Sequence, residues 1–399
     1  MVDFCPDDTA ELKAWRMEVR EFLEEAWPRG KVFDYDYDED PAGWAEYRRF
    51  WEKVGQKGWV ALTWSKDYYG QGRTAIERWI LNEEFNAHAA PSYPVIGLAV
   101  ASAILRVGTH EQRRRHLKGI AEATVLWGEG YTEPSAGSDL ASLTTRADRD
   151  GDYWVLNGAK TLGTAAHHCE WMSVLARSDP NSSKHNGISC FLVPLDTPGI
   201  QMLPLHNMGG GQQNQTYFEN VRIPADCLLG EEGAAWNQVW FGLGGDQLDV
   251  PGPVLDGHTM RIARMLGEII HYCKTTRRGG APLAEDPVIK IQLGELILGV
   301  EAIKLAVFES YSNVANGGIG GRGALSSNLN QAFYKEFWPH LGQVCMEIVG
   351  PIAQIQGGKW AQMEGRVEKY FRTSFGNHAG GTAQLKRMVA ATRGLGLPR

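Results

Sequence analysis

Residues Tyr131 to Leu140, YTEPSAGSDL, combine side-chain types that suit a ligand-binding surface. Small residues such as Ala136 and Gly137 let a backbone approach a ligand closely and present its amide N–H groups. The hydroxyls of Thr132 and Ser138 both donate and accept hydrogen bonds. Such a surface fits a pyrophosphate or the edge of a heteroaromatic ring. From composition alone, a loop that merely caps a β unit is an equally good interpretation.

Other common sites lack support in the sequence. No GxxxxGK[ST], GxSxG or HExxH occurs, and no GxGxxG follows a predicted strand and opens a helix. Adjacent His167 and His168 would point in different directions, a poor geometry for one metal ion. The six cysteines are widely spaced and form no CxxC pair, so we expect no metal centre and no disulfide framework. A reducing compartment, and therefore a cytoplasmic location, is the simpler expectation.

Charge and hydropathy exclude two classes of partner. The net charge is -7 with both signs interspersed, which gives no electrostatic footprint for nucleic acid and no polybasic membrane patch. No run of 18 apolar residues is present, so no membrane-spanning helix is expected. The first residues have no basic region followed by an apolar run, so no secretion signal is expected either.

The elements that must position the loop change character twice along the chain. Residues 1–126 are predicted to be helical, since Leu12, Trp15, Val19 and Phe22 recur at the spacing of one helix face. Thr109-His110-Glu111-Gln112 has the form of a capping box at a helix start. Residues 127–235 read as a β unit, and residues 236–399 as helical again.

Short strands follow one another in the middle region without helices between them. A turn at Asp150-Gly151-Asp152 precedes a predicted strand at 153–156, and Asn157-Gly158 after it is a hairpin signal. Further strands are predicted at 171–176, 188–193, 216–218 and 221–224. This pattern predicts a small antiparallel barrel or sandwich.

The last region opens its long helix at Glu285-Asp286-Pro287, with acids and a proline near the first turn. Apolar residues cover much of that helix's circumference, so we expect it to be buried, in part against another subunit. The glycine-rich stretch 316–322 is predicted to be a loop between helices.

Several separated motifs, in order along nearly the whole chain, resemble those of the acyl-CoA dehydrogenase family in a bacterial form. They are WGEG at 127–130, YTEPSAGSDLASLTTRA at 131–147, NGAK at 157–160, NVRIPAD at 220–226, LGEEG at 229–233, GAPLAEDP at 280–287, GGTAQLKR at 380–387 and RGLGLP at 393–398. The fold implied by this resemblance is α+β and mostly α. It has an N-terminal helical domain, a central small β-barrel domain and a C-terminal four-helix bundle.

The resemblance implies an enzyme that binds FAD and converts an acyl-CoA thioester to enoyl-CoA. A carboxylate removes the α-proton while the β-hydrogen leaves as hydride to the flavin, so the cofactor does the hydride chemistry. Electrons then pass to an electron-transferring flavoprotein. A homotetramer or heterotetramer, or a dimer, and a role in fatty acid or lipid catabolism are also implied.

The resemblance assigns FAD contacts by position to Glu129, Tyr131, Thr132, Gly137, Ser138, Leu162, Thr164, Arg277, Thr382 and Gln384. Ser138 is also assigned to the CoA arm. Leu162 stands where relatives tend to have a tryptophan that packs on the flavin, and its smaller side chain would open space or weaken that packing. Arg277 lies within one residue of a family arginine that reaches the FAD of a neighbouring subunit.

The catalytic base departs from the commonest family pattern, because Gly380 stands at the position of its glutamate. In members of this kind the glutamate comes from an LxxER motif on a helix. Here the matching stretch aligns Asp246 with that glutamate and Gln247, a substrate contact, with the arginine. Asp246 is therefore the candidate base, and burial would raise its pKa into a useful range. An aspartate that only caps a helix is the alternative.

Two interpretations of the whole chain follow. In the first, the protein is an active dehydrogenase of a bulky or branched acyl-CoA, with Asp246 as base. In the second, it is a catalytically inactive or repurposed subunit that completes a heteromeric complex with an active paralogue.

Overall fold

The computed structural model describes residues 8–28, 40–91, 95–239, 256–315, 322–375 and 380–398. Contacts divide the chain into two compact units. One comprises Met1–Lys31, Ala75–Ala90 and Val254–Arg399, and the other Val32–Thr74 and Pro91–Pro253. We call them the helical unit and the β-containing unit. Within the described ranges, no helix has the length and apolar character needed to cross a membrane.

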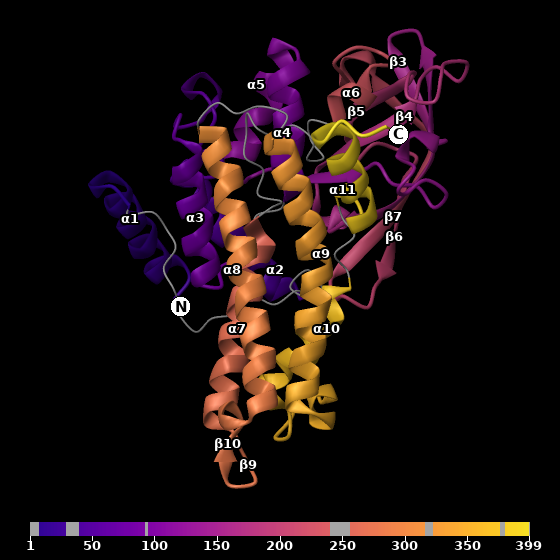
Figure 1. Ribbon diagram of the computed structural model, residues 1–399. Helices are drawn as coiled ribbons and strands as arrows, with labels where there is room; N and C mark the ends of the chain where they lie inside the picture. The colour runs from indigo at the N-terminus through magenta and orange to yellow at the C-terminus, as the bar shows by residue number, and fades with distance from the viewer. Residues whose placement is uncertain are drawn as a thin grey trace. The chain divides into compact units, whose positions relative to one another are not determined.

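An eight-stranded sheet forms the centre of the β-containing unit (Figure 1). Its strands are β1 (Trp127–Gly130), β2 (Arg146–Asp150), β3 (Tyr153–Thr164), β4 (Trp171–Arg177), β5 (Ile188–Pro194), β6 (Ile200–His206), β7 (Gln212–Pro224) and β8 (Leu228–Leu229). The strand order is β6-β7-β3-β2-β4-β5-β8, and β1 pairs with β4 in parallel. Alternate residues of the strands, among them Trp154, Phe191 and Phe218, fill a shared apolar core.

Two sequence predictions within this sheet are wrong. Asn157-Gly158 is not a hairpin turn, because β3 continues through it with a shift of register against β7. Gly158 approaches Thr145 so closely that a Cβ would lie 2.5 Å from the threonine Oγ1, and the shift makes room for that approach. The separate strands predicted at 216–218 and 221–224 are one strand, β7.

Helices of the same unit are α2 (Pro41–Gln56), α4 (Val95–Val107), α5 (His110–Ala121) and α6 (Ala235–Val239). The predicted capping box is confirmed: Thr109 Oγ1 accepts from the Gln112 N–H, and Gln112 Oε1 accepts from the Thr109 N–H. Gln112 Nε2 also donates to the carbonyls of Asp226 and Leu228 at 2.8 Å. One residue therefore starts α5 and fastens it beside β8.

The helical unit contains α1 (Ala10–Ala26), α3 (Ala75–Ala87), α7 (Asp256–Thr275), α8 (Pro287–Ala315), α9 (Arg322–Val349), α10 (Arg366–Ser374) and α11 (Ala383–Val389). The periodicity predicted for the first helix is confirmed, since Trp15, Val19 and Leu23 are buried. Long helices α7, α8 and α9 run alongside one another, and the hairpin of β9 (Arg277–Arg278) and β10 (Ala281–Pro282) joins α7 to α8 (Figure 1).

Helix α8 begins as predicted, with Pro287 in its first position and Asp286 Oδ1 accepting from the N–H groups of Val288 and Ile289. Within the chain one side of this helix is buried, and burial of its other side against another subunit stays a prediction. Leu296, Val300 and Ile303 are buried, whereas Ile291 and Leu298 are 65% and 73% exposed. Helices α3, α7 and α9 pack against α8 and cover one side of it.

The predicted fold class, α+β and mostly α, with helical regions around a small β domain, is confirmed. In the described residues helices outweigh strands. The boundaries 1–126, 127–235 and 236–399 stay a prediction. Of the predicted glycine-rich loop at 316–322, residues 316–321 lie outside the described residues, and Arg322 is already the first residue of α9.

Candidate functional site

The YTEPSAGSDL stretch forms the loop that leaves β1 and leads toward β2. Its first turn closes by two backbone hydrogen bonds, from the Glu133 N–H to the Ala136 carbonyl and from the Ala136 N–H to the Glu133 carbonyl, at 3.0 and 3.1 Å. Ser135, Gly137 and Ser138 are exposed. An added Cβ at Gly137 would meet no atom within 4 Å, so this surface is open to a ligand.

A buried ion pair anchors this loop. Lys160 Nζ on β3 lies 2.7 Å from Glu133 Oε1, and each side chain is 2% exposed. The other donors to the carboxylate are the Thr144 N–H and Oγ1 and the Thr145 N–H, at 2.7 to 2.8 Å. Burial alone would raise the pKa of Glu133, but the Lys160 charge and these hydrogen bonds outweigh it and hold that pKa at about 2. Glu133 is therefore ionised at neutral pH.

The sequence assigned no role to either partner of this ion pair, although the strand pattern indicated that Lys160 would be buried. Strand alternation puts Lys160 on the same side as Trp154 and Leu156, which are buried. A lysine on an inward position requires a partner, because burying an isolated charge is costly. The acidic Glu133 in the loop supplies it.

Leu162 and Thr164 lie near the end of β3, beside the loop. The register of β3 against β7 shifts between Lys160 and Gly163, and Leu162 sits in this irregularity with φ of 61°. Left-handed backbone is unusual for a leucine and marks a local strain. Leu162 is 53% exposed, and Thr164 is exposed as well. The end of β3 therefore exposes both the apolar side chain of Leu162 and the hydroxyl of Thr164.

Glu129 adjoins this piece of strand, since a Cβ on Gly163 would lie 3.7 Å from the Glu129 carbonyl oxygen. Desolvation raises the pKa of the Glu129 carboxyl to about 7. Tyr131, which directly follows β1, is buried, and its hydroxyl lies 3.0 Å from Ser173 Oγ. Burial raises the pKa of this phenol well above its usual value, so it stays protonated.

The structure therefore brings together the predicted residues of the β-containing unit. Glu129, Tyr131, Thr132, Gly137, Ser138, Leu162 and Thr164 lie on the loop and on the neighbouring ends of β1 and β3. We call this group the cradle. The backbone hydrogen bond from the Thr161 N–H to the Thr132 carbonyl, 2.9 Å long, joins its two halves.

Three predicted residues belong to the helical unit. Arg277 is exposed on β9, where its guanidinium donates to the Gly280 carbonyl at 2.7 Å. Thr382 is the N-cap of α11, and its Oγ1 accepts from the Leu385 N–H. Gln384 is exposed in the first turn of that helix. Asp246 and Gln247 lie outside the described residues, so their roles stay predictions.

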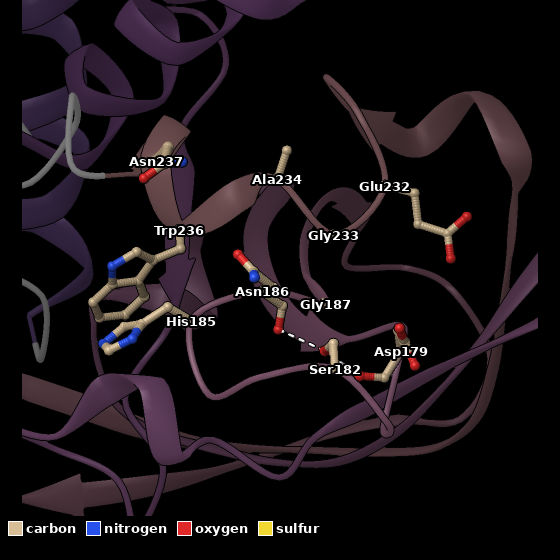
Figure 2. A pocket seen from close by; sticks show the side chains of 10 residues that line it. All are labelled: Asp179, Ser182, His185, Asn186, Gly187, Glu232, Gly233, Ala234, Trp236 and Asn237. Atoms are coloured by element: carbon tan, nitrogen blue, oxygen red, sulfur yellow. Dashed lines mark hydrogen bonds between the residues drawn. The ribbon is translucent and has the colours of Figure 1, made fainter.

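A cavity of about 520 Å³ opens on the β-containing unit (Figure 2). It lies between the loop that joins β4 to β5 and the turn that leads into α6. The rings of His185 and Trp236 lie side by side on one wall, with centroids 4.8 Å apart. Asp179 and Glu232 place carboxylates on the opposite side. Of these four residues only Glu232 belongs to a motif of the sequence, LGEEG at 229–233, and the sequence assigned a role to none of them.

The cavity is connected to the cradle loop by polar contacts. Lys184 Nζ lies 2.6 Å from Asp139 Oδ2, next to Ser138. Arg177 donates to the carbonyls of Ala141 and Asn186 at 2.9 and 3.2 Å. The loop that lines the cavity is thus fastened to the residues that follow the cradle.

Comparison with known proteins places this arrangement in a family. Residues 9–124, 128–221 and 257–395 match the family models described as acyl-CoA dehydrogenase N-terminal, middle and C-terminal domain. The chain is 32% identical over 362 residues to acyl-CoA dehydrogenase FadE26 of Mycobacterium tuberculosis, covering 88% of each chain. It is 31% identical to acyl-CoA dehydrogenase IpdE1 of the same organism, over 89% of each.

Solved structures agree in fold. The ChsE4-ChsE5 complex from Mycobacterium tuberculosis contains a chain with a TM-score of 0.85 and 30% identity, covering 99% of this chain and 100% of that one. The Tcur3481-Tcur3483 steroid ACAD has a TM-score of 0.86 and 28% identity, with 98% and 99% covered. Members of the matched family are FAD-dependent enzymes. The chain, with its helical regions, its central sheet and its loop motif in place, belongs to the acyl-CoA dehydrogenase family.

Proposed function

We propose that this protein uses FAD to dehydrogenate a bulky acyl-CoA thioester between its α and β carbons, giving an enoyl-CoA. One observation supports the proposal most. The cradle loop exposes Gly137 and Ser138, and the buried ion pair between Glu133 and Lys160 anchors that loop to β3. A loop that merely capped the sheet would need no such internal anchoring, since a buried ion pair costs desolvation.

The residues present fit FAD. Gly137 and Ser138 leave open space where the backbone and a hydroxyl can meet a phosphate. The exposed Leu162 side chain would be buried by the face of a flat ring, which removes apolar surface from water. Protonated Tyr131 and the high pKa of Glu129 keep extra negative charge away from an anionic cofactor near neutral pH. FAD, when bound, supplies the acceptor for the β-hydrogen as hydride.

The chain itself would supply proton removal and orientation. Asp246 would take the α-proton, and Gln247 would contact the substrate beside it. Thr132 and Thr164 would hold the ring, and Ser138 the phosphates and the CoA arm. Thr382 and Gln384 would add contacts from the helical unit, and Arg277 would reach the FAD of a neighbouring subunit. An electron-transferring flavoprotein would then accept the electrons.

The cavity of Figure 2 fits the nucleotide end of CoA. Its aromatic pair, His185 and Trp236, offers a surface on which a base can stack, and the acids Asp179 and Glu232 accept hydrogen bonds from an amino group. Carboxylates repel phosphates, so the base rather than the phosphates suits this cavity. Its connection through Arg177 to Ala141, which follows the cradle loop, matches a long ligand that starts at the cradle.

A second function is supported by the structural neighbours. Two of them are two-component proteins by name, the ChsE4-ChsE5 complex and the Tcur3481-Tcur3483 steroid ACAD. Together with Gly380 at the usual base position, this favours a non-catalytic or repurposed subunit of a heteromeric complex as the alternative. Either role suits lipid catabolism.

The test is flavin spectroscopy of the purified chain, followed by anaerobic titration with a panel of straight, branched and steroid acyl-CoA thioesters. We expect a bound flavin spectrum and bleaching by a bulky thioester. If FAD is bound but no thioester bleaches it, the proposed dehydrogenase activity is rejected and a role as a non-catalytic subunit is favoured. Co-purification of a homologous chain that restores bleaching would lead to the same conclusion.

Asp246→Asn in the same titration tests the base. We expect FAD binding to persist and the bleaching rate to fall at least 100-fold, because general-base catalysis contributes roughly that much. Bleaching at the wild-type rate would show that the base lies elsewhere and that Asp246 only caps a helix.

A further inference from the structure

The ion pair between Glu133 and Lys160 has no part in hydrogen transfer, yet it is the most completely buried charged contact at the cradle. Both side chains are 2% exposed, and both Glu133 oxygens accept two hydrogen bonds each. The carboxylate is thus satisfied on every side, an arrangement that makes a buried charge tolerable.

Its geometry fixes the backbone on both sides of Thr132. Lys160 Nζ donates to the Tyr131 carbonyl at 3.2 Å as well as to Glu133. The Thr132 carbonyl accepts from the Thr161 N–H, the residue that follows Lys160 on β3. Residues 131, 132 and 133 are therefore each bonded to β3, and their conformation is set by that strand.

We propose that the Glu133–Lys160 pair is a positioning device that holds the cradle in its binding conformation before FAD arrives. This inference rests on the proposed use of FAD. A preorganised loop spends less conformational entropy on binding, so losing the pair weakens FAD affinity. Removing one partner also leaves the other as an uncompensated buried charge, which pushes the loop away from β3.

The same loop carries a matched control at its other end. Lys184 and Asp139 form an ion pair of similar length, 2.6 Å, but their side chains are 53% and 59% exposed. Solvent screens such a pair, and its removal changes little. A second control is Ile223→Ala, which empties part of the sheet's core on β7 and destabilises the unit without touching the loop.

The experiment measures the dissociation constant of FAD for apoprotein prepared from wild type, Lys160→Met, Glu133→Gln, Lys184→Met and Ile223→Ala. Quenching of flavin fluorescence reports binding, and circular dichroism confirms that each apoprotein is folded at the working temperature. Lys160→Met and Glu133→Gln are expected to raise the dissociation constant at least tenfold. Lys184→Met and Ile223→Ala should stay within threefold of wild type.

If either single variant does not fold, the double variant Glu133→Gln/Lys160→Met, which leaves no buried charge, is used instead. Its dissociation constant for FAD is also expected to rise at least tenfold. Wild-type affinity in the Lys160 and Glu133 variants would overturn the proposal. Equal loss in Ile223→Ala would also overturn it, because general destabilisation would then explain the effect. A wild-type chain that binds no FAD would reject the proposed function itself, a result distinct from both.

Discussion

Glu129, in the WGEG motif, has an acid–base property that its residue type does not reveal. In water a glutamate is ionised at neutral pH, but desolvation raises the pKa of this carboxyl to about 7. In the unfolded chain the pKa returns to about 4.5, the ordinary value. The folded protein therefore binds more protons than the unfolded chain between these two pH values, and its stability falls as pH rises through that window.

We expect Glu129→Gln to stabilise the protein above pH 7 and to be neutral below pH 4.5, because the amide has no charge to desolvate. The gain at high pH is at most about 3 kcal/mol, from 1.36 kcal/mol per pKa unit. Thermal unfolding at pH 4.5 and pH 8 measures it, with exposed Glu219→Gln on β7 as control. A gain of equal size at both pH values would contradict the raised pKa.

At the scale of elements, the loop between β4 and β5 and the turn before α6 together make the cavity of Figure 2. Their backbones are joined, since the Gly187 N–H donates to the Gly233 carbonyl at 3.1 Å and Ser189 Oγ accepts from the Gly233 N–H at 2.8 Å. The His185 and Trp236 rings are thereby held on separate segments that cannot move apart easily. This is the feature that suits a flat ligand group.

Trp236→Ala is expected to raise KM for acyl-CoA about tenfold, because it removes one stacking contact, which is worth about 1–3 kcal/mol. It should leave KM for the same acyl group on N-acetylcysteamine unchanged, since that thioester lacks the nucleotide. The control is Trp360→Ala, an exposed tryptophan of the helical unit. An equal effect on both thioesters would place the nucleotide elsewhere.

At the scale of the whole molecule, α8 presents an apolar face that no described segment of the helical unit covers. Ile291, Leu298 and Leu305 recur every seven residues along it, and Val288 extends the stripe toward the start of the helix. Seven-residue spacing keeps side chains on one side of a helix, so the exposed residues form one continuous strip. Exposed apolar strips of this kind mark association surfaces.

We expect the wild-type chain to assemble with itself or with a homologous chain, and Ile291→Lys/Leu298→Lys to dissociate that assembly, because lysine charges would be buried in the contact. Light scattering coupled to size exclusion measures the mass. Met17→Lys, at an exposed position on α1, is the control and should assemble normally. A double variant that keeps the wild-type mass would exclude this face.

Local signals in the sequence predicted many elements correctly. The capping box at Thr109, the start of α8 at Pro287 and the apolar face of α1 need only a few neighbouring residues, so their prediction did not depend on the fold. The hairpin predicted at Asn157-Gly158 was wrong because it, too, was inferred from neighbouring residues alone. A turn signal is local, whereas the pairing of β3 with β7 and the close approach of Thr145 come from distant parts of the chain.

By itself, the sequence determined the family, the order of helical and β regions, and the loop that carries the candidate cradle, because these depend on motif identity and short-range periodicity. Tertiary structure alone decided which charges are buried and what they bind. Lys160 and Glu133 are 27 residues apart, and only the pairing of the loop with β3 makes them an anchor. The pKa of Glu129, the aromatic wall of the cavity and the uncovered face of α8 likewise depend on what the fold packs against each residue, which sequence spacing does not encode.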